Sequence, residues 1–133
     1  MIDLIDELKS EHKIILDILS EIKTLGISSR PSQEKLLSAK NLLLAHMRKE
    51  DEHYYPALKR AAANNSDLKI MLDYFVKDME AVSVHAMHLF DKYSEGGDET
   101  EFAADFTLLY MTLKDRIHAE EKTLFVKFHQ LEK

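Results

Sequence analysis

The sequence contains no cysteine and no tryptophan, and it has only three glycines and two prolines among its 133 residues. Without cysteine there are no disulfides, no iron–sulfur clusters and no thiol catalysis, and the chain is compatible with the reducing cytoplasm, where we expect it. Glycine and proline are the strongest breakers of regular structure, so their scarcity predicts long uninterrupted elements.

Long apolar runs and a strong charge of one sign are also missing. No apolar run approaches membrane-spanning length, and the early acids of the N-terminus are unlike a signal peptide. Acidic and basic residues are interleaved and give a formal net charge of −6, so we expect neither a nucleic-acid nor a membrane partner. Nothing in the sequence indicates a protein partner. The seven histidines are the one compositional oddity.

Apolar residues recur at helical spacing in four segments, at about residues 3–25, 31–62, 66–94 and 98–128. Turn-forming residues separate the segments, and Pro56 lies inside the second one, where it predicts a kink. The sequence therefore predicts an all-α fold, with residues 1–133 forming one domain. The expected architecture is an up-down-up-down antiparallel four-helix bundle.

The second segment contains the stretch HMRKEDEHYYP at residues 46–56. At about 100° per residue, His46, Glu50 and His53 fall on one helix face within roughly 40° of each other. Ala39 and Leu43 lie on the same face, which we interpret as facing the core. A histidine and a carboxylate that point into an apolar interior need partners, because burying them unpaired is costly. A metal ion is one such partner.

Each predicted helix supplies an ionisable side chain at or near its inner face. These residues are His12 in the first helix, His46 and Glu50 in the second, His85 in the third, and Arg116, Glu120 and (at the edge) Glu121 in the fourth. Imidazoles and carboxylates suit iron, so we interpret the set as a non-haem iron site. The alternative is a buried hydrogen-bonded network that sets helix register; contributions from four helices favour the metal. We interpret His88, His118 and His129 as solvated surface residues.

Three motifs resemble the hemerythrin-like (HHE cation-binding) domain family. They are Glu11-His12, His46-x-x-x-Glu50-Asp51-x-x-Tyr54-Tyr55-Pro56 and Val84-His85, and the segment from Arg116 to Phe125 is similar to the family's second helix motif. The resemblance covers essentially the whole chain. It implies a four-helix bundle with a di-iron centre that binds dioxygen or, in relatives, handles nitric oxide, peroxide or iron itself.

Arg116 departs from the family pattern, which has a histidine at this position. Arginine does not deprotonate in proteins, so it cannot be a metal ligand. We expect its guanidinium to line the site and to pair with Glu50, Glu120 or Glu121. In this role it would occupy the volume and supply the charge of one metal ion.

The third helix also departs from the oxygen-carrying branch of the family, which has two histidines four residues apart. Here His85 and His88 are three apart, so that ligand set is incomplete. Two replacements remain open. A change of register could bring His118 inward, or His53 could supply the missing ligand from the second helix; otherwise His53 is a structural histidine or a donor to a ligand.

We therefore predict that the metal ligands are His12, His46, Glu50, His85 and either Glu120 or Glu121. The cofactor would be one or two iron ions per chain, at a di-iron or incomplete site. The expected role is to bind or sense a small diatomic or redox signal such as O2, NO or peroxide, more than to transport oxygen reversibly.

Two other functions stay open at this point. One is a metal-free structural or interaction bundle in which an Arg116–carboxylate network replaces the metal. The other is an enzyme of the di-iron oxidase kind. Ferritin-type enzymes place a Glu-x-x-His pair on each of two helices, and the sequence shows a single pair, Glu50 and His53. We therefore favour a role without turnover.

Overall fold

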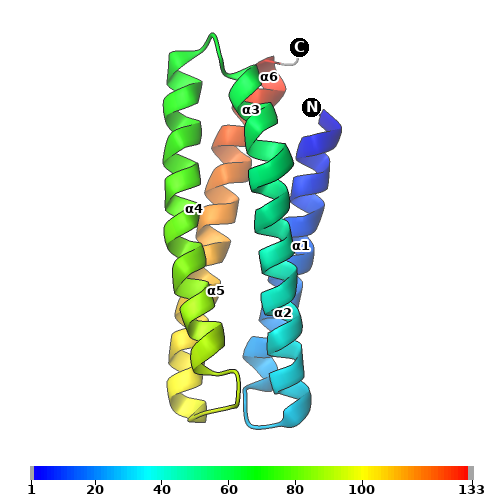
Figure 1. The fold of residues 1–133 in the computed structure, drawn as a ribbon, viewed down its shortest axis with the longest axis vertical. Helices are drawn as coiled ribbons and strands as arrows, with labels where there is room; N and C mark the ends of the chain where they lie inside the picture. The colour runs from blue at the N-terminus through cyan, green and yellow to red at the C-terminus, as the bar shows by residue number, and fades with distance from the viewer. Residues whose placement is uncertain (1, 132–133) are drawn as a thin grey trace.

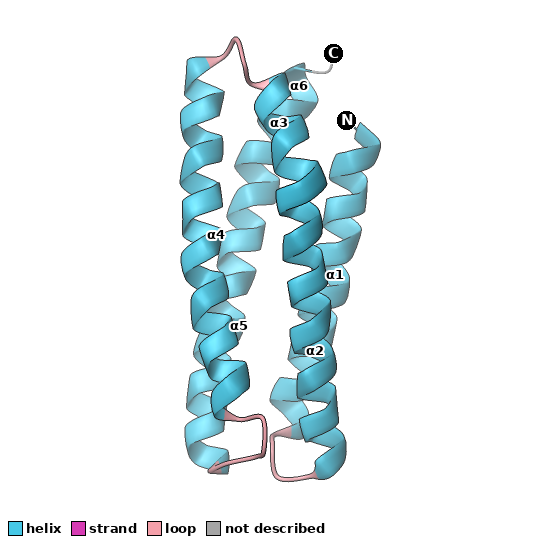
Figure 2. Cartoon of the chain, in the orientation of Figure 1, coloured by secondary structure: helices cyan, strands magenta, loops and turns pink. Residues whose placement is uncertain are grey.

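The computed structural model describes residues 2–131. Within that range the chain is helical, without a β-strand (Figure 2). The elements are α1 (Ile2–Leu25), α2 (Arg30–Lys49), η1 (Glu50–Tyr54), α3 (Tyr55–Ala61), α4 (Ser66–Lys92), α5 (Glu99–Ala119), η2 (Glu120–Leu124) and α6 (Phe125–Leu131), where η denotes a π-helical turn. Because α2, η1 and α3 follow one another directly, as do α5, η2 and α6, the chain forms four long helical segments.

The four segments pack as a four-helix bundle. Helix α1 packs against α2 and α5, and α4 packs against the same two helices. The α1–α2 and α4–α5 connections lie at one end of the bundle, and the α3–α4 connection lies at the other (Figure 1). Among the described residues, no helix is long and apolar enough to cross a membrane.

Short polar side chains begin the helices that follow each connection. The side chains of Ser29, Asn65 and Asp98 each accept a hydrogen bond from the backbone N–H three residues on, which satisfies a donor that the helix leaves free. Gly26 follows α1 with a positive φ of 80°, a conformation that glycine adopts without strain. The predicted turns are therefore confirmed.

Two apolar clusters fill the bundle, one on each side of a polar layer. One contains residues between positions 15 and 43 and between 82 and 117. The other contains residues in the ranges 5–8, 54–75 and 124–128. Between these clusters lie His12 in α1, His46 and Glu50 in α2 and η1, Asp78 and Met79 in α4, and Glu120 in η2. The ionisable side chains thus share one level of the bundle, and α4 brings Asp78 and Met79 to it instead of His85.

The helix interruption predicted near Pro56 takes the form of a π-helical turn. In η1 the backbone N–H of Tyr55 donates to the carbonyl of Glu50, five residues back. Pro56 then falls in the first turn of α3, where its missing N–H is tolerated. In η2 the N–H of Phe125 donates to the carbonyl of Glu120 in the same way, without any proline. Proline is therefore not needed to form the π turn.

Candidate metal centre

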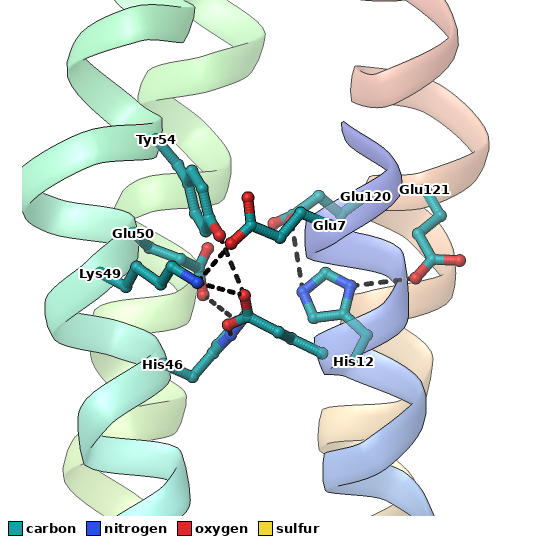
Figure 3. A network of polar contacts seen from close by, with 9 residues as sticks. Glu7, His12, His46, Lys49, Glu50, Tyr54, Glu120 and Glu121 are labelled. Carbon is teal, nitrogen blue, oxygen red and sulfur yellow. Dashed lines mark hydrogen bonds and ion pairs between the residues drawn. The ribbon is translucent and has the colours of Figure 1, made fainter. Parts of the chain in front are cut away.

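Two histidines and a glutamate meet in the polar layer. His12 comes from α1, His46 from the last turn of α2, and Glu50 from the first position of η1 (Figure 3). All three are buried, and each offers a ligand atom that lies within 4.8 Å of the other two. The two imidazole rings approach edge to face, with centroids 5.1 Å apart. The structure thus brings three of the predicted residues together.

Glu120 completes the buried polar group from the opposite side of the bundle. It is the first residue of η2, and its Oε1 lies 3.8 Å from Nε2 of His12. Glu121 has a different place: its Oε2 lies 2.9 Å from Nδ1 of the same ring, at the half-buried rim. Of the two adjacent glutamates, Glu120 therefore faces the cluster, and Glu121 contacts the outer ring nitrogen of His12.

Each histidine has a carboxylate on its outer nitrogen. Nδ1 of His46 lies 2.8 Å from Oε1 of Glu11, which matches the contact between His12 and Glu121. A carboxylate only accepts, so each Nδ1 carries the hydrogen. The Nε2 atoms therefore face the cluster. A carboxylate on the outer nitrogen is the arrangement by which proteins orient histidines that bind metals.

The inner contact of His46 shows where a cation would enter. Its Nε2 lies 2.5 Å from Oε1 of Glu50. Burial opposes charging of His46, but the hydrogen bonds and negative charges of Glu50 and Glu11 outweigh burial and raise its pKa above the ordinary value. The contact between Nε2 of His46 and the Glu50 carboxylate is therefore one that favours a positive charge, and a metal ion bound between them would supply that charge.

Unbalanced negative charge is the second sign that the site fits a cation. Oε2 of Glu50 is buried and has no hydrogen-bond partner within the described chain, a condition that folded proteins rarely leave unexplained. Burial, and then the charges of Glu50 and Glu121, raise the pKa of Glu120 well above its ordinary value. Two buried carboxylates and two imidazoles form a donor set suited to iron and similar divalent ions.

His12 is already in the form that a ligand needs. Burial lowers its pKa below the ordinary value, although the hydrogen bond with Glu121 acts in the opposite direction. The ring is therefore neutral at physiological pH, and its Nε2 keeps a free lone pair. Metal ligation requires neutral imidazole.

Glu11 links His46 to a polar network at the surface. Its Oε2 accepts hydrogen bonds from Lys49 Nζ and Tyr54 Oη, each at 2.9 Å, and Lys49 also contacts Glu7 (Figure 3). Burial opposes ionisation of Glu11, but the bonds from Lys49, His46 and Tyr54 lower its pKa. The network thus holds Glu11 as a carboxylate. Sequence reasoning missed this role; the adjacency of Glu11 to His12 was the available signal.

Arg116 does not reach the buried carboxylates, so the expected pairing with Glu50, Glu120 or Glu121 is wrong. Its Nε lies 2.8 Å from Oδ2 of Asp78 on α4, and the side chain is 37% exposed. The Asp78 oxygen that it contacts is buried, and Arg116 itself is half-buried. Asp78 was absent from the predicted site residues.

His85 lies outside the cluster, which corrects its expected inward position. Its side chain is exposed, because Val82, Ala86 and Leu89 carry the buried face of α4 and His85 falls at the edge of that face. His85 also lies beyond the polar layer along α4, beside the first apolar cluster. The structure therefore does not bring it near His12 or His46.

The two suggested replacement ligands, His53 and His118, are exposed as well. The π turn explains His53: its wider spacing carries Tyr54, not His53, back to the core after Glu50. The prediction that His53 faces inward is wrong for this reason. His88, His118 and His129 are exposed, which confirms their interpretation as surface residues.

The comparisons with known proteins agree with this geometry. The family model described as the hemerythrin HHE cation binding domain matches residues 3–128. No curated protein and no solved structure matches the chain. Because the family match spans nearly the whole chain and includes every residue of the buried layer, the chain belongs to the hemerythrin HHE cation-binding domain family.

Proposed function

We propose that this protein binds iron in its buried polar layer and uses it to bind or sense a small diatomic or redox signal such as O2, NO or peroxide. His12, His46 and Glu50 would hold the metal, with Glu120 reaching it from the opposite helix. The observation that carries the proposal is the buried carboxylate of Glu50, which lies beside two oriented histidines and keeps one oxygen without a hydrogen-bond partner among the described residues.

Iron suits this donor set, because two histidines and a carboxylate are a common ligand group for non-haem Fe(II). When bound, the iron would supply a redox couple and an open position for a small ligand. The chain's own residues orient and shield the site. Glu121 and Glu11 fix the imidazoles of His12 and His46, and the apolar clusters above and below exclude water.

A small pocket beside Glu50 supports a ligand of diatomic size. Its volume is about 40 Å³. The lining residues are Met47, Glu50, Asp51, Tyr55, Val76, Met79, Glu80 and Ser83. A cavity needs about 10–15 Å³ by this measure to hold one water molecule, so the pocket has room for a ligand the size of O2, NO or peroxide. Its mostly apolar inner wall suits uncharged gases.

Two finer expectations belong to this proposal. One is that the helices run up-down-up-down, which the alternating positions of the connections in Figure 1 support. The other is a reducing compartment such as the cytoplasm, with which a cysteine-free chain is compatible.

Anaerobic loading with Fe(II), followed by metal analysis and optical spectroscopy with and without NO, tests the proposal. We expect bound iron that survives desalting and a spectrum that changes when NO is added. His46→Gln is the matched negative control and should retain no iron. A folded wild-type protein without iron after loading would overturn the proposal and favour a metal-free interaction bundle.

A further inference from the structure

The chain repeats one backbone arrangement twice at the level of the polar layer. In each copy an α-helix leads into a five-residue π turn, which begins at a buried glutamate and continues into a further α-helix. The glutamates are Glu50 and Glu120, and the first residues of the following helices are the buried aromatics Tyr55 and Phe125. The two copies therefore correspond residue by residue.

The correspondence extends to the position four residues before each glutamate, which holds His46 in one copy and Arg116 in the other. Each of these side chains contacts an acid on a neighbouring helix. His46 Nδ1 lies 2.8 Å from Glu11, and Arg116 Nε lies 2.8 Å from Asp78. The two acids are similarly exposed, at 23% and 22%. The acid–partner contact is thus conserved in geometry while the partner changes.

The residue after each acid completes the comparison. His12 follows Glu11 and is buried in the cluster, whereas Met79 follows Asp78 and packs against the first apolar cluster. We call the part of the polar layer formed by α1, α2 and η1 the first half, and the part formed by α4, α5 and η2 the second half. Both imidazoles of the first half are therefore replaced in the second half. Arginine cannot coordinate a metal, and a thioether is a soft ligand that does not favour iron.

We propose that this protein holds a single metal ion per chain, on the α1–α2 side of the layer. The inference rests on the function proposed above. His12, His46 and Glu50 hold the ion, and Glu120 is the one ligand group that the second half retains. The Arg116–Asp78 pair and Met79 occupy the positions from which a second ion would be bound, so the second half is closed to metal.

Charge supports the same assignment. In the first half, a buried oxygen of Glu50 has no hydrogen-bond partner among the described residues, so a bound cation would stabilise this carboxylate. In the second half, Oδ2 of Asp78 is likewise buried and without a hydrogen bond from the described residues, but Nε of Arg116 lies 2.8 Å from it. This permanent cation neutralises Asp78 and repels a second metal ion nearby. One half therefore needs an added cation, and the other half carries its own.

Metal stoichiometry tests the proposal directly. Purified wild-type protein is dialysed against excess Fe(II) under anaerobic conditions, and bound iron is counted by elemental analysis and native mass spectrometry. We expect one ion per chain. After oxidation, a single ferric ion gives a half-integer-spin EPR signal, whereas a coupled ferric pair gives none. Two ions per chain with a silent spectrum would overturn the inference.

Restoring the second half is the complementary test. The double substitution Met79→His and Arg116→His returns both imidazoles beside Asp78 and should raise the count to two ions per chain. Met79→Gln with Arg116→Gln is the matched control and should stay at one. A folded double-histidine variant that still binds one ion would contradict the proposal. If that variant does not fold, the wild-type count and EPR signal decide. Zero iron in the wild type would instead remove the proposed function.

Discussion

The two halves of the polar layer share a backbone and differ in chemistry. In the first half, His46 lies four residues before Glu50 and is buried; in the second half, Arg116 lies four residues before Glu120 and its side chain is 37% exposed. Both halves contain a π turn, in which the backbone N–H five residues after the glutamate donates a hydrogen bond to the glutamate's carbonyl. The π turn therefore forms with either set of side chains, and the side chains alone decide which half can hold a metal.

The second π turn indicates the structural role of both turns. A π turn is a rare interruption that often marks a functional site, and Pro56 could have explained the first one. The second occurs without proline, and each begins at a buried glutamate. The added residue in each turn lets a glutamate point inward and still returns the next aromatic or apolar residue to the core. The turn thus places a carboxylate in the layer without disrupting the packing beyond it.

Exchanging the corresponding residues His46 and Arg116 for glutamine gives the largest contrast between the halves. His46→Gln removes a metal ligand, so iron affinity should fall by more than about 100-fold, beyond the range for outer partners. Arg116→Gln should leave one bound ion and nearly the same affinity. Titration with Fe(II) measures both. Equal losses in the two variants would show that the halves are equivalent.

The acids that hold these residues form a second, smaller contrast. Glu11→Gln and Glu121→Gln each remove the carboxylate on the outer nitrogen of a histidine, so each should weaken iron binding by about 10–100-fold. Asp78→Asn, the counterpart of Glu11 in the second half, should leave iron affinity unchanged. A marked loss of iron in Asp78→Asn would place metal in the second half.

The pH dependence of the metal-free protein isolates Glu120. Because burial raises its pKa, the folded state binds more protons than the unfolded state above the ordinary value of 4.5. The contribution of Glu120 to stability should therefore decline as pH rises from 4.5 through the raised pKa. Glu120→Gln should flatten this decline. Urea unfolding between pH 4.5 and 8 checks it, and an unchanged slope in the variant would contradict the assignment.

The smallest expected effect belongs to the Arg116–Asp78 pair. The Arg116 side chain is 37% exposed, but the Asp78 oxygen that it contacts is buried, so Arg116→Ala should lower the free energy of unfolding by about 1 kcal/mol, the upper end for a partly exposed ion pair. Chemical denaturation of the metal-free protein measures the difference. A loss of about 3–5 kcal/mol would indicate that the guanidinium balances deeply buried carboxylates, as the metal-free alternative requires.

Periodicity predicted the helices and much of the inner face because both depend on local spacing. The apolar stripe made His12, His46 and Glu50 visible as buried polar residues, and the chemistry of arginine excluded Arg116 as a ligand. The prediction for His53 was wrong because an uninterrupted α-helix would turn this residue inward, whereas the π turn η1 changes the rotation after Glu50.

Other site residues depend on contacts that no local pattern contains. Glu11 and His46 are 35 positions apart, and His12 and Glu121 are 109 apart. Their pairing requires the helices to be in register. The same register brings Asp78 and Met79 to the polar layer and leaves His85 beyond it, although His85 lies near the apolar stripe of its own helix.

The sequence alone determined four amphipathic helices, their connections, a buried histidine–carboxylate motif and the arginine that breaks the motif's second copy. It could do so because helix periodicity and side-chain chemistry are properties of short segments. Only the tertiary structure decided which acids orient the histidines, which glutamate faces the cluster and which residues α4 brings to the polar layer. Those choices depend on the axial register of packed helices, which is set by the apolar clusters above and below the layer.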